Sequence, residues 1–445
     1  MMKEIVSFLL LTLPLVGQLE EFIASPILKS ASVGVLVVPL EGEEEVVSHQ
    51  ADLALIPAST LKAVTTATAL QVLRKNFVFE TKLYLNGDDL VIVGGGDPIL
   101  TAVKFPEWWK ALKDSGLKEI KGKIVADASR FESQVVPNSW QWGDVGNYYG
   151  SGPWGLNFNG NAYSLTFQPG EVGEPAELIK TEPTPPGVVF ENHMLTGPEG
   201  SGDQGYVYGG PGAKVITLRG SVPMGGPFTI YGSLPSPPLS CATAFQEFLE
   251  EKDFAVGGNA EVGSPELDEA KLLHRQKSIS LEKIIRATNF QSVNLYADTL
   301  FKMLGEDGTS KQAIAAVKDH WEKQEVDLTG FVMRDGSGLS PRNVITPRQL
   351  VTILKKARQH ETGDDFLNSL PVAGRSGSVA GFGKGTEMAG RVWVKPGGLS
   401  GVRTYTGYYT NKSGKEFVFA VMMNNYLSSP TKIAEEFLTA LVAKE

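Results

Sequence analysis

The sequence IPASTLKAVTTATALQVL, residues 56–73, contains almost only apolar and small residues, and this run predicts a helix. It shows no polar face, so we expect the helix to be buried on most sides. Lys62 is the only charged residue between Ala58 and Leu73. Because lysine is rarely buried without a partner, a lysine at this position requires a specific explanation.

Strand-like runs lie before this helix and after it. The runs SVGVLVVPL and EEVVSHQ, residues 32–40 and 44–50, predict a β-hairpin. Between about residues 77 and 262, short strand-like runs alternate with turns rich in Gly and Pro. Within this part, Asn86-Gly87 predicts the turn of a second hairpin.

Helical patterns return further along, and the chain ends with strand-like runs and a closing helix. Ser429 is the predicted N-cap of this last helix, and Pro430 is its predicted first residue. The two ends of the chain thus share helices and strands, while the middle has strands and loops. We therefore predict an α+β fold in which residues 18–76 and 267–445 form one discontinuous domain and residues 77–266 form a large, mostly β insertion.

Residues 1–17 have the pattern of a secretory signal peptide, with Lys3 before an apolar run from Ile5 to Val16 and the small Gly17 after it. The run is too short to span a bilayer, and no other segment approaches that length. No cysteine follows the run, which argues against a lipoprotein anchor. We expect an exported mature chain, periplasmic or extracellular, without an integral membrane span; an ordinary N-terminal core segment is the alternative.

Composition narrows the classes of partner and cofactor. The formal net charge of −9 argues against nucleic acid and against an anionic membrane surface as main partners. Cys241 is the only cysteine, so one chain forms neither a disulfide nor a cysteine-based metal site. The five histidines lack metal-ligand spacing, and the runs GGGDP and GFGKGT do not match the nucleotide-binding fingerprints. We therefore expect neither a metal nor a cofactor.

The pattern Ser-x-x-Lys points to chemistry at Ser59 and Lys62. The same pattern occurs at Ser115, Ser280 and Ser429, where helix ends or caps explain it. On the predicted helix, Ser59 and Lys62 share one face, with β-carbons about 5–6 Å apart. Lysine is mostly protonated at neutral pH, but burial and a second cation would lower its pKa and let it accept the serine proton. A lysine that extends to solvent from the helix start is the structural alternative.

Two further motifs help to decide between a catalytic Ser59–Lys62 pair and a lysine that extends to solvent. The run FQSVNLYADTL places Ser292 and Asn294 between two helical segments, and VWVKPGGLSGV places Lys395 at the end of a strand. This order of motifs resembles that of the penicillin-recognising serine enzymes. The runs GGGDPIL, SWQWGDVGNYYG, MRDGSGLS, LPVAGRSGSVAG and KGTEMAGRVWVK are similar to those of the D-alanyl-D-alanine carboxypeptidase/endopeptidase family, the class C low-molecular-mass penicillin-binding proteins. The similarity spans nearly the whole mature chain.

The resemblance implies a serine β-lactamase/transpeptidase-like fold, with an antiparallel sheet flanked by helices, and a role for each polar residue of the motifs. Ser59 would be the acylated nucleophile and Lys62 its base. Ser292 would relay a proton towards the leaving amine, and Asn294 would bind the substrate amide and help to hold the base. Lys395 would attract the terminal carboxylate of the substrate.

The resemblance also implies how a substrate is held. The backbone N–H groups of Ser59 and Gly398 would form the oxyanion hole, and Lys395, Gly397, Gly398 and Ser400 would contact the substrate. The substrates would be D-Ala-D-Ala stem peptides or cross-bridges of peptidoglycan, and β-lactam antibiotics would be covalent inhibitors. Such an enzyme needs no cofactor.

The third motif departs from the family, in which Lys-Thr-Gly is followed by Thr or Ser. Here it reads Lys395-Pro396-Gly397-Gly398, so both hydroxyls that would bind the carboxylate are absent. Each lost hydrogen bond to a charged group is worth about 1.5–3 kcal/mol. Two interpretations stay open: a working serine DD-peptidase with altered carboxylate recognition, and a catalytically weak or inactive homologue that binds peptidoglycan or a partner protein. A serine β-lactamase ranks third, because no deacylating Glu is found and the insertion is long.

Overall fold

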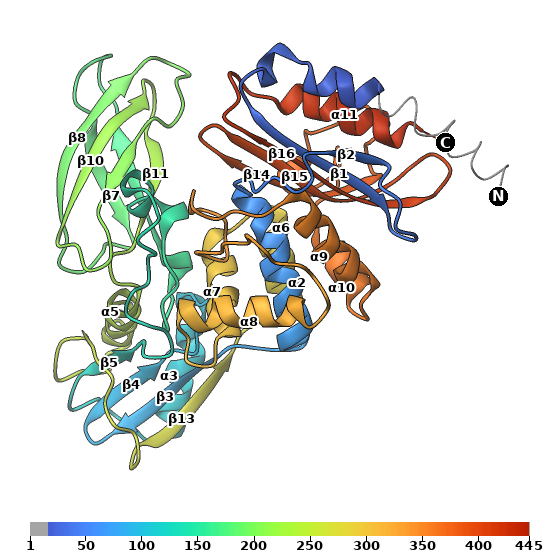
Figure 1. The fold of residues 1–445 in the computed structure, drawn as a ribbon. Helices are drawn as coiled ribbons and strands as arrows, with labels where there is room; N and C mark the ends of the chain where they lie inside the picture. Colours follow the sequence, from blue (N-terminus) through green and yellow to red (C-terminus); the bar gives the residue numbers. More distant parts are fainter. Residues whose placement is uncertain (1–16, 445) are drawn as a thin grey trace. The chain divides into compact units, whose positions relative to one another are not determined.

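The computed structural model describes residues 17–444, which divide into two compact units (Figure 1). The first unit contains residues 17–77, 280–305 and 310–444, and the second contains residues 78–279 and 306–309. Almost all of the predicted signal peptide, residues 1–16, lies outside the described residues.

A five-stranded antiparallel sheet forms the centre of the first unit, with the strand order β14-β15-β16-β1-β2. Strand β1 pairs with β16 along its whole length, from Ser32 opposite Asn424, so the two ends of the chain share one sheet. The hairpin predicted from the first two apolar runs is confirmed as β1 and β2. The strands are β1 Ser32–Pro39, β2 Val47–His49, β14 Val392–Leu399, β15 Val402–Thr410 and β16 Glu416–Asn424.

Helices cover both faces of this sheet (Figure 1). Every residue of β16 after Glu416 is buried, which requires apolar cover on both sides. On one face, α11 (Thr431–Val442) packs with the helical segment 17–23, where the rings of Phe22 and Phe437 stack with centroids 4.7 Å apart. On the other face, α9 (Pro347–Gln359) packs against β1 and β16.

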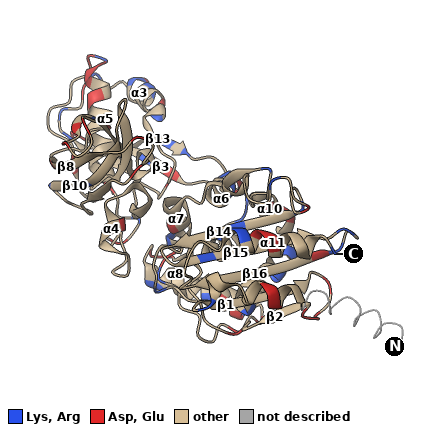
Figure 2. Cartoon of the chain, turned by 90° about the horizontal axis from the view of Figure 1, so that it is seen from above, with Lys and Arg blue, Asp and Glu red and all other residues tan. Residues whose placement is uncertain are grey.

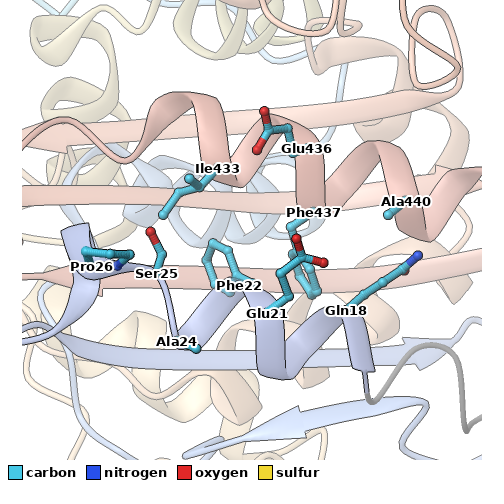
Figure 3. A pocket seen from close by; sticks show the side chains of 10 residues that line it. All are labelled: Gln18, Glu21, Phe22, Ala24, Ser25, Pro26, Ile433, Glu436, Phe437 and Ala440. Atoms are coloured by element: carbon cyan, nitrogen blue, oxygen red, sulfur yellow. The ribbon is translucent and has the colours of Figure 1, made fainter.

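A pocket lies between α11 and the N-terminal segment. Figure 3 shows Gln18, Phe22 and Ser25 on one side of it and Ile433 and Phe437 on the other. None of the residues that line it belongs to the three sequence motifs, so it is separate from the candidate chemistry.

Helix α2 (Leu61–Leu73) follows the 3-10 turn η2 (Ala58–Thr60), as the apolar run predicted. All its residues from Leu61 to Gln71 are buried, so the prediction of a helix enclosed on most sides is confirmed. The helices that pack against it besides α9 are α6 Leu281–Gln291, α7 Asn294–Leu304, α8 Ser310–Glu322 and α10 Gly363–Ser369.

The second unit contains three sheets, with the orders β12-β5-β4-β3-β13, β11-β6-β7 and β8-β10-β9. Helices α3 (Phe105–Asp114) and α5 (Pro237–Glu250) share a core with the first of these sheets, and α4 (Trp142–Val145) is a single short turn. The strands are β3 Glu80–Asn86, β4 Asp89–Val93, β5 Ile124–Asp127, β6 Ala162–Gln168, β7 Glu177–Glu182, β8 Val189–Gly197, β9 Tyr206–Tyr208, β10 Val215–Pro223, β11 Phe228–Ser233, β12 Glu261–Val262 and β13 Lys271–Lys277.

The inserted region ends later than predicted. The sequence placed its end at residue 266, but β13 pairs with β3 and extends the second unit to residue 279. Residues 306–309 also belong to this unit. The pattern of β13 alone did not show that the strand belongs to the second unit, because its partner strand β3 lies almost 200 residues earlier in the chain.

Two local predictions were wrong by one residue. The turn of the second hairpin is Gly87-Asp88, because Asn86 pairs with Asp89 as the last rung of the ladder. Gly87 has a φ of 60°, which suits glycine in a tight turn. The closing helix α11 begins at Thr431, with Pro430 rather than Ser429 at the N-cap.

Charged residues of both signs are interspersed along the elements of the described part of the chain (Figure 2). The net charge of −9 is therefore spread over the chain and not gathered on one element. In the described part of the chain, no helix has both the length and the apolar character needed to cross a membrane.

A hydrogen bond between two fully buried side chains joins α2 to α8. The indole N–H of Trp321 donates to Thr68 Oγ1 at 2.8 Å. Thr68→Val keeps the shape of the side chain but leaves the indole N–H without an acceptor. We therefore expect the free energy of unfolding of the first unit to fall by about 1–3 kcal/mol, as measured by urea denaturation. Thr68→Ser keeps the acceptor and is the control; equal stability of the Val variant and the wild type would contradict this prediction.

Candidate active site

Close backbone contacts fix the position of Ser59, which lies in η2 two residues before α2 begins. The preceding residue, Ala58, has a φ of 47°, which is rare for a residue other than glycine. A Cβ on Gly338 would lie 1.8 Å from the carbonyl oxygen of Ala58, and a Cβ on Gly397 would lie 2.9 Å from Ser59 N. Only glycine at these two positions lets a loop and a strand approach the serine from two sides.

The amine of Lys62 is fully buried and surrounded by three oxygen atoms. Its Nζ donates to Ser59 Oγ at 2.9 Å, to Asn294 Oδ1 at 2.6 Å and to the carbonyl oxygen of Ser337 at 2.7 Å. Burial lowers the pKa of Lys62 to about 8. The lysine is therefore poised to exchange a proton with Ser59 near neutral pH. The alternative of a lysine that extends to solvent is excluded.

A buried carboxylate holds the loop that supplies Ser337. Asp298 lies one turn after Asn294 on α7, and its Oδ1 accepts hydrogen bonds from the backbone N–H groups of Gly336 at 2.7 Å and Ser337 at 3.0 Å. Burial raises the pKa of Asp298 to about 7, and its negative charge opposes the lowering of the Lys62 pKa. Sequence analysis did not assign Asp298 to the site, although its spacing of four residues from Asn294 places both on one helix face.

A second carboxylate shapes the same loop. Asp335 accepts hydrogen bonds from the backbone N–H groups of Gly338 and Ser340, both at 2.7 Å, and from Asn343 Nδ2 at 2.9 Å. The loop therefore presents the Ser337 carbonyl to Lys62 and Gly338 to the turn of Ser59. Sequence analysis did not predict the contact between Ser337 and Lys62, because the atom of Ser337 that contacts the lysine is a backbone oxygen.

Ser292 and Lys395 form a second serine–lysine pair. Ser292 lies between α6 and α7, as predicted, and has a φ of 60°, whereas Asn294 is the first residue of α7 and does not lie between the helices as predicted. Lys395 Nζ donates to Ser292 Oγ at 2.8 Å and to the carbonyl oxygen of Pro396 at 2.9 Å. Lys395 is fully buried, and this burial, together with the positive charge of Lys62, holds its pKa well below the ordinary value for lysine.

Strand β14 is an edge strand, and its second half is open on the outer side. The N–H of Val394 donates to the carbonyl oxygen of Pro371 at 2.9 Å, so residues 371–373 cover only the first half. Backbone N–H groups of alternate residues point to the same side, so the nitrogen of Pro396 and the N–H of Gly398 also face outward. Pro396 therefore removes no hydrogen bond from the sheet, as expected for proline on an edge strand.

The other residues of the third motif occupy different places. Lys395 is the fourth of eight residues in β14, so it lies in the middle of the strand and not at its end as predicted. Gly397 is buried beside Ser59, and Gly398 is exposed. Ser400 is exposed in the turn between β14 and β15, beyond the end of the strand.

The first unit thus gathers the five predicted polar residues into two groups, Ser59–Lys62–Asn294 and Ser292–Lys395. A serine with an amine base in hydrogen-bond reach is the arrangement that covalent catalysis requires. Among residues 17–444, no cluster of three or more His, Cys, Asp or Glu side chains could hold a metal ion. The chemistry that these side chains support is acyl transfer through a serine.

Known proteins match the chain over nearly its whole length. Residues 15–443 match the family model of the D-Ala-D-Ala carboxypeptidase 3 (S13) family. A D-alanyl-D-alanine carboxypeptidase of Actinomadura sp. (strain R39) is 29% identical over 443 residues, which cover 94% of this chain and 82% of that protein.

Solved structures share the fold. A crystal structure of penicillin binding protein 4 (dacB) from Haemophilus influenzae has a TM-score of 0.80 at 23% identity and covers 96% of this chain and 97% of that one. A structure of the same protein complexed with a β-lactam has a TM-score of 0.77 at 21% identity, with 96% and 99% covered. The predicted α+β fold with an antiparallel sheet flanked by helices is confirmed. The chain belongs to the D-Ala-D-Ala carboxypeptidase 3 (S13) family and is a serine-type carboxypeptidase of that family.

Proposed function

We propose that the chain is a DD-peptidase that cleaves D-Ala-D-Ala stem peptides or peptide cross-bridges of peptidoglycan through an acyl-enzyme on Ser59. The observation that carries this proposal is the fully buried amine of Lys62, 2.9 Å from Ser59 Oγ. Because burial brings the pKa of this amine to about 8, it can take the serine proton at neutral to mildly basic pH.

The proposed acylation uses both serine–lysine pairs. Ser59 Oγ attacks the carbonyl carbon of the scissile bond while its proton passes to Lys62. The N–H groups of Ser59 and Gly398 hold the resulting oxyanion. The proton taken up by Lys62 is relayed through Ser292 to the leaving amine, so both side chains regain their starting protonation, and the C–N bond breaks to leave an ester on Ser59. Water then hydrolyses this ester, which releases the shortened peptide and restores the serine.

Asn294 and Lys395 hold the substrate in this proposal. Asn294, the first residue of α7, already fixes Lys62 through its side-chain oxygen, and in this proposal its side chain also binds the peptide amide. Lys395 supplies positive charge for the terminal carboxylate. Gly397 keeps β14 close to Ser59, so a peptide that lies along the open edge of this strand passes the nucleophile.

The missing hydroxyls at positions 396 and 398 alter carboxylate recognition in this enzyme. Their loss removes two hydrogen bonds worth about 1.5–3 kcal/mol each, unless another group replaces them. A catalytically weak or inactive homologue that binds peptidoglycan or a partner protein is the alternative. The hydrogen bond between Lys62 and Ser59 supports the active form, because a buried lysine is costly to keep where it has no function.

The proposal includes β-lactam antibiotics as covalent inhibitors. The complex of the similar Haemophilus influenzae protein with a β-lactam supports this. Peptidoglycan lies outside the cytoplasmic membrane, so the proposed substrate agrees with export through the predicted signal peptide, residues 1–17, into the periplasm or the medium.

Labelling with a fluorescent penicillin tests the nucleophile. We expect a covalent label on the wild type and none on Ser59→Ala, as seen by in-gel fluorescence of the denatured protein. Ser280→Ala is the matched control, because it removes the serine of another Ser-x-x-Lys pattern at the start of α6 and should keep the label. If the wild type stays unlabelled at high reagent concentration, the proposal of an active DD-peptidase is contradicted and the non-catalytic alternative is favoured.

The pH dependence of acylation tests the role of Lys62. The neutral amine is the base, so the acylation rate should rise with pH and level off above about 8, the pKa of Lys62. Asp298→Asn keeps the oxygen that accepts two backbone hydrogen bonds but removes a negative charge that raises the Lys62 pKa. Asp298 is ionised above about pH 7, so the midpoint of the variant should move to lower pH.

Stopped-flow acylation by a chromogenic β-lactam between pH 6 and 10 measures this midpoint. Asp327→Asn changes a fully exposed carboxylate and should leave the midpoint in place. A rate that falls with increasing pH, or the same midpoint in Asp298→Asn as in the wild type, would show that Lys62 is not the base.

A further inference from the structure

Arg403 on β15 lies beside the altered third motif, and its side chain has no hydrogen-bond or ion-pair partner among the described residues. It pairs across the two strands with Gly398 of β14. The side chain is half-buried, and its Nε is buried without a hydrogen-bond partner. Within residues 17–444 it makes no ion pair. A guanidinium whose Nε is buried without an acceptor gains from an anion that accepts its hydrogen bonds.

Arg403 projects to the sheet face that lacks the two hydroxyls. Side chains of alternate residues on a strand point to the same face, and residues paired across antiparallel strands share a face. A Cβ on Gly397 would point towards Ser59 N, so Pro396 and Gly398 point to the opposite face. Arg403, as the partner of Gly398, lies on that same face.

The guanidinium occupies the space that a side chain at position 398 would need. Nη1 of Arg403 lies 3.0 Å, and its Cζ 3.4 Å, from the position of a Cβ on Gly398. The arginine therefore reaches from β15 across β14, next to the open half of the edge strand. A threonine at position 398 would displace it. Glycine at position 398 therefore has two effects: it provides no hydroxyl, and it leaves space for the guanidinium of Arg403.

We propose that Arg403 binds the terminal carboxylate of the peptide substrate, in place of the hydroxyls absent at positions 396 and 398. This inference rests on the proposed function, because it assigns the carboxylate contact of the same site. The planar guanidinium offers two parallel N–H donors to a carboxylate. Arg403 thus determines specificity for a free C-terminus and takes no part in the chemical step.

Binding without catalysis gives the sharpest test. In a Ser59→Ala protein, we compare diacetyl-L-Lys-D-Ala-D-Ala with the same peptide carrying a C-terminal amide, by NMR titration. The free acid should bind at least about tenfold more tightly than the amide, the ratio expected for one hydrogen bond to a charged group. Adding Arg403→Gln should remove most of the preference for the acid, leaving only the part that the charge of Lys395 supplies, and should leave the affinity for the amide unchanged.

Two further variants separate this role from a general effect on the fold. Arg391→Gln changes an exposed arginine next to the start of β14 and should keep the preference for the acid. Gly398→Thr restores a hydroxyl and displaces the guanidinium, so Arg403→Gln should cost much less in that background. An acid that binds no better than the amide, or a preference for the acid of the same size in Arg403→Gln as without it, would overturn the inference.

The two proposals fail in different ways. If penicillin does not label the wild type but the Ser59→Ala protein prefers the acid through Arg403, the proposed carboxylate contact is supported and the proposed peptidase activity is contradicted. If penicillin labels Ser59 but the preference for the acid is independent of Arg403, the peptidase stands and the arginine does not bind the carboxylate.

Discussion

The site depends on the burial of one amine, Nζ of Lys62. An ammonium group kept from water needs acceptors at close range, and here Ser59, Asn294 and the carbonyl of Ser337 supply them. These three residues come from η2, the start of α7 and a loop almost 280 residues after the serine. The hydrogen bonds of one lysine therefore hold three distant segments of the chain together around Ser59. The same burial lowers the pKa of the amine, so the structural and the chemical role have one physical cause.

Much of the fold and of this site could be predicted from the sequence, where a pattern reports directly on burial. A helix without a polar face must be enclosed, and this placed Lys62 in the interior before its partners were known. The order of three short motifs then identified Ser292, Asn294 and Lys395. Such motifs can be recognised because they consist of particular side chains, which are given directly by the sequence.

The parts that could not be predicted depend on backbone atoms and on distant pairing. The carbonyl of Ser337 contacts Lys62, yet every residue has a carbonyl, so no residue type marks that position. The second unit ends later than predicted because β13 pairs with β3. The hairpin turn lies at Gly87-Asp88 because Asn86 pairs with Asp89. The space above Gly398 is visible only once β15 places Arg403 opposite it.

The two lysines of the site place a constraint on each other. Both are buried, and the positive charge of Lys62 disfavours charge on Lys395. Lys62 has the negative charges of Asp298 and Asp335 nearby, whereas Lys395 is hydrogen-bonded to a hydroxyl and a carbonyl. The proton is therefore held more firmly by Lys62 than by Lys395. In the proposed complex, a carboxylate along β14 would stabilise positive charge on Lys395 and so favour the neutral form of Lys62. An anionic substrate end would in this way help to create the base for the attack, which gives a cation at the edge of β14 a role in a strand that lacks both hydroxyls.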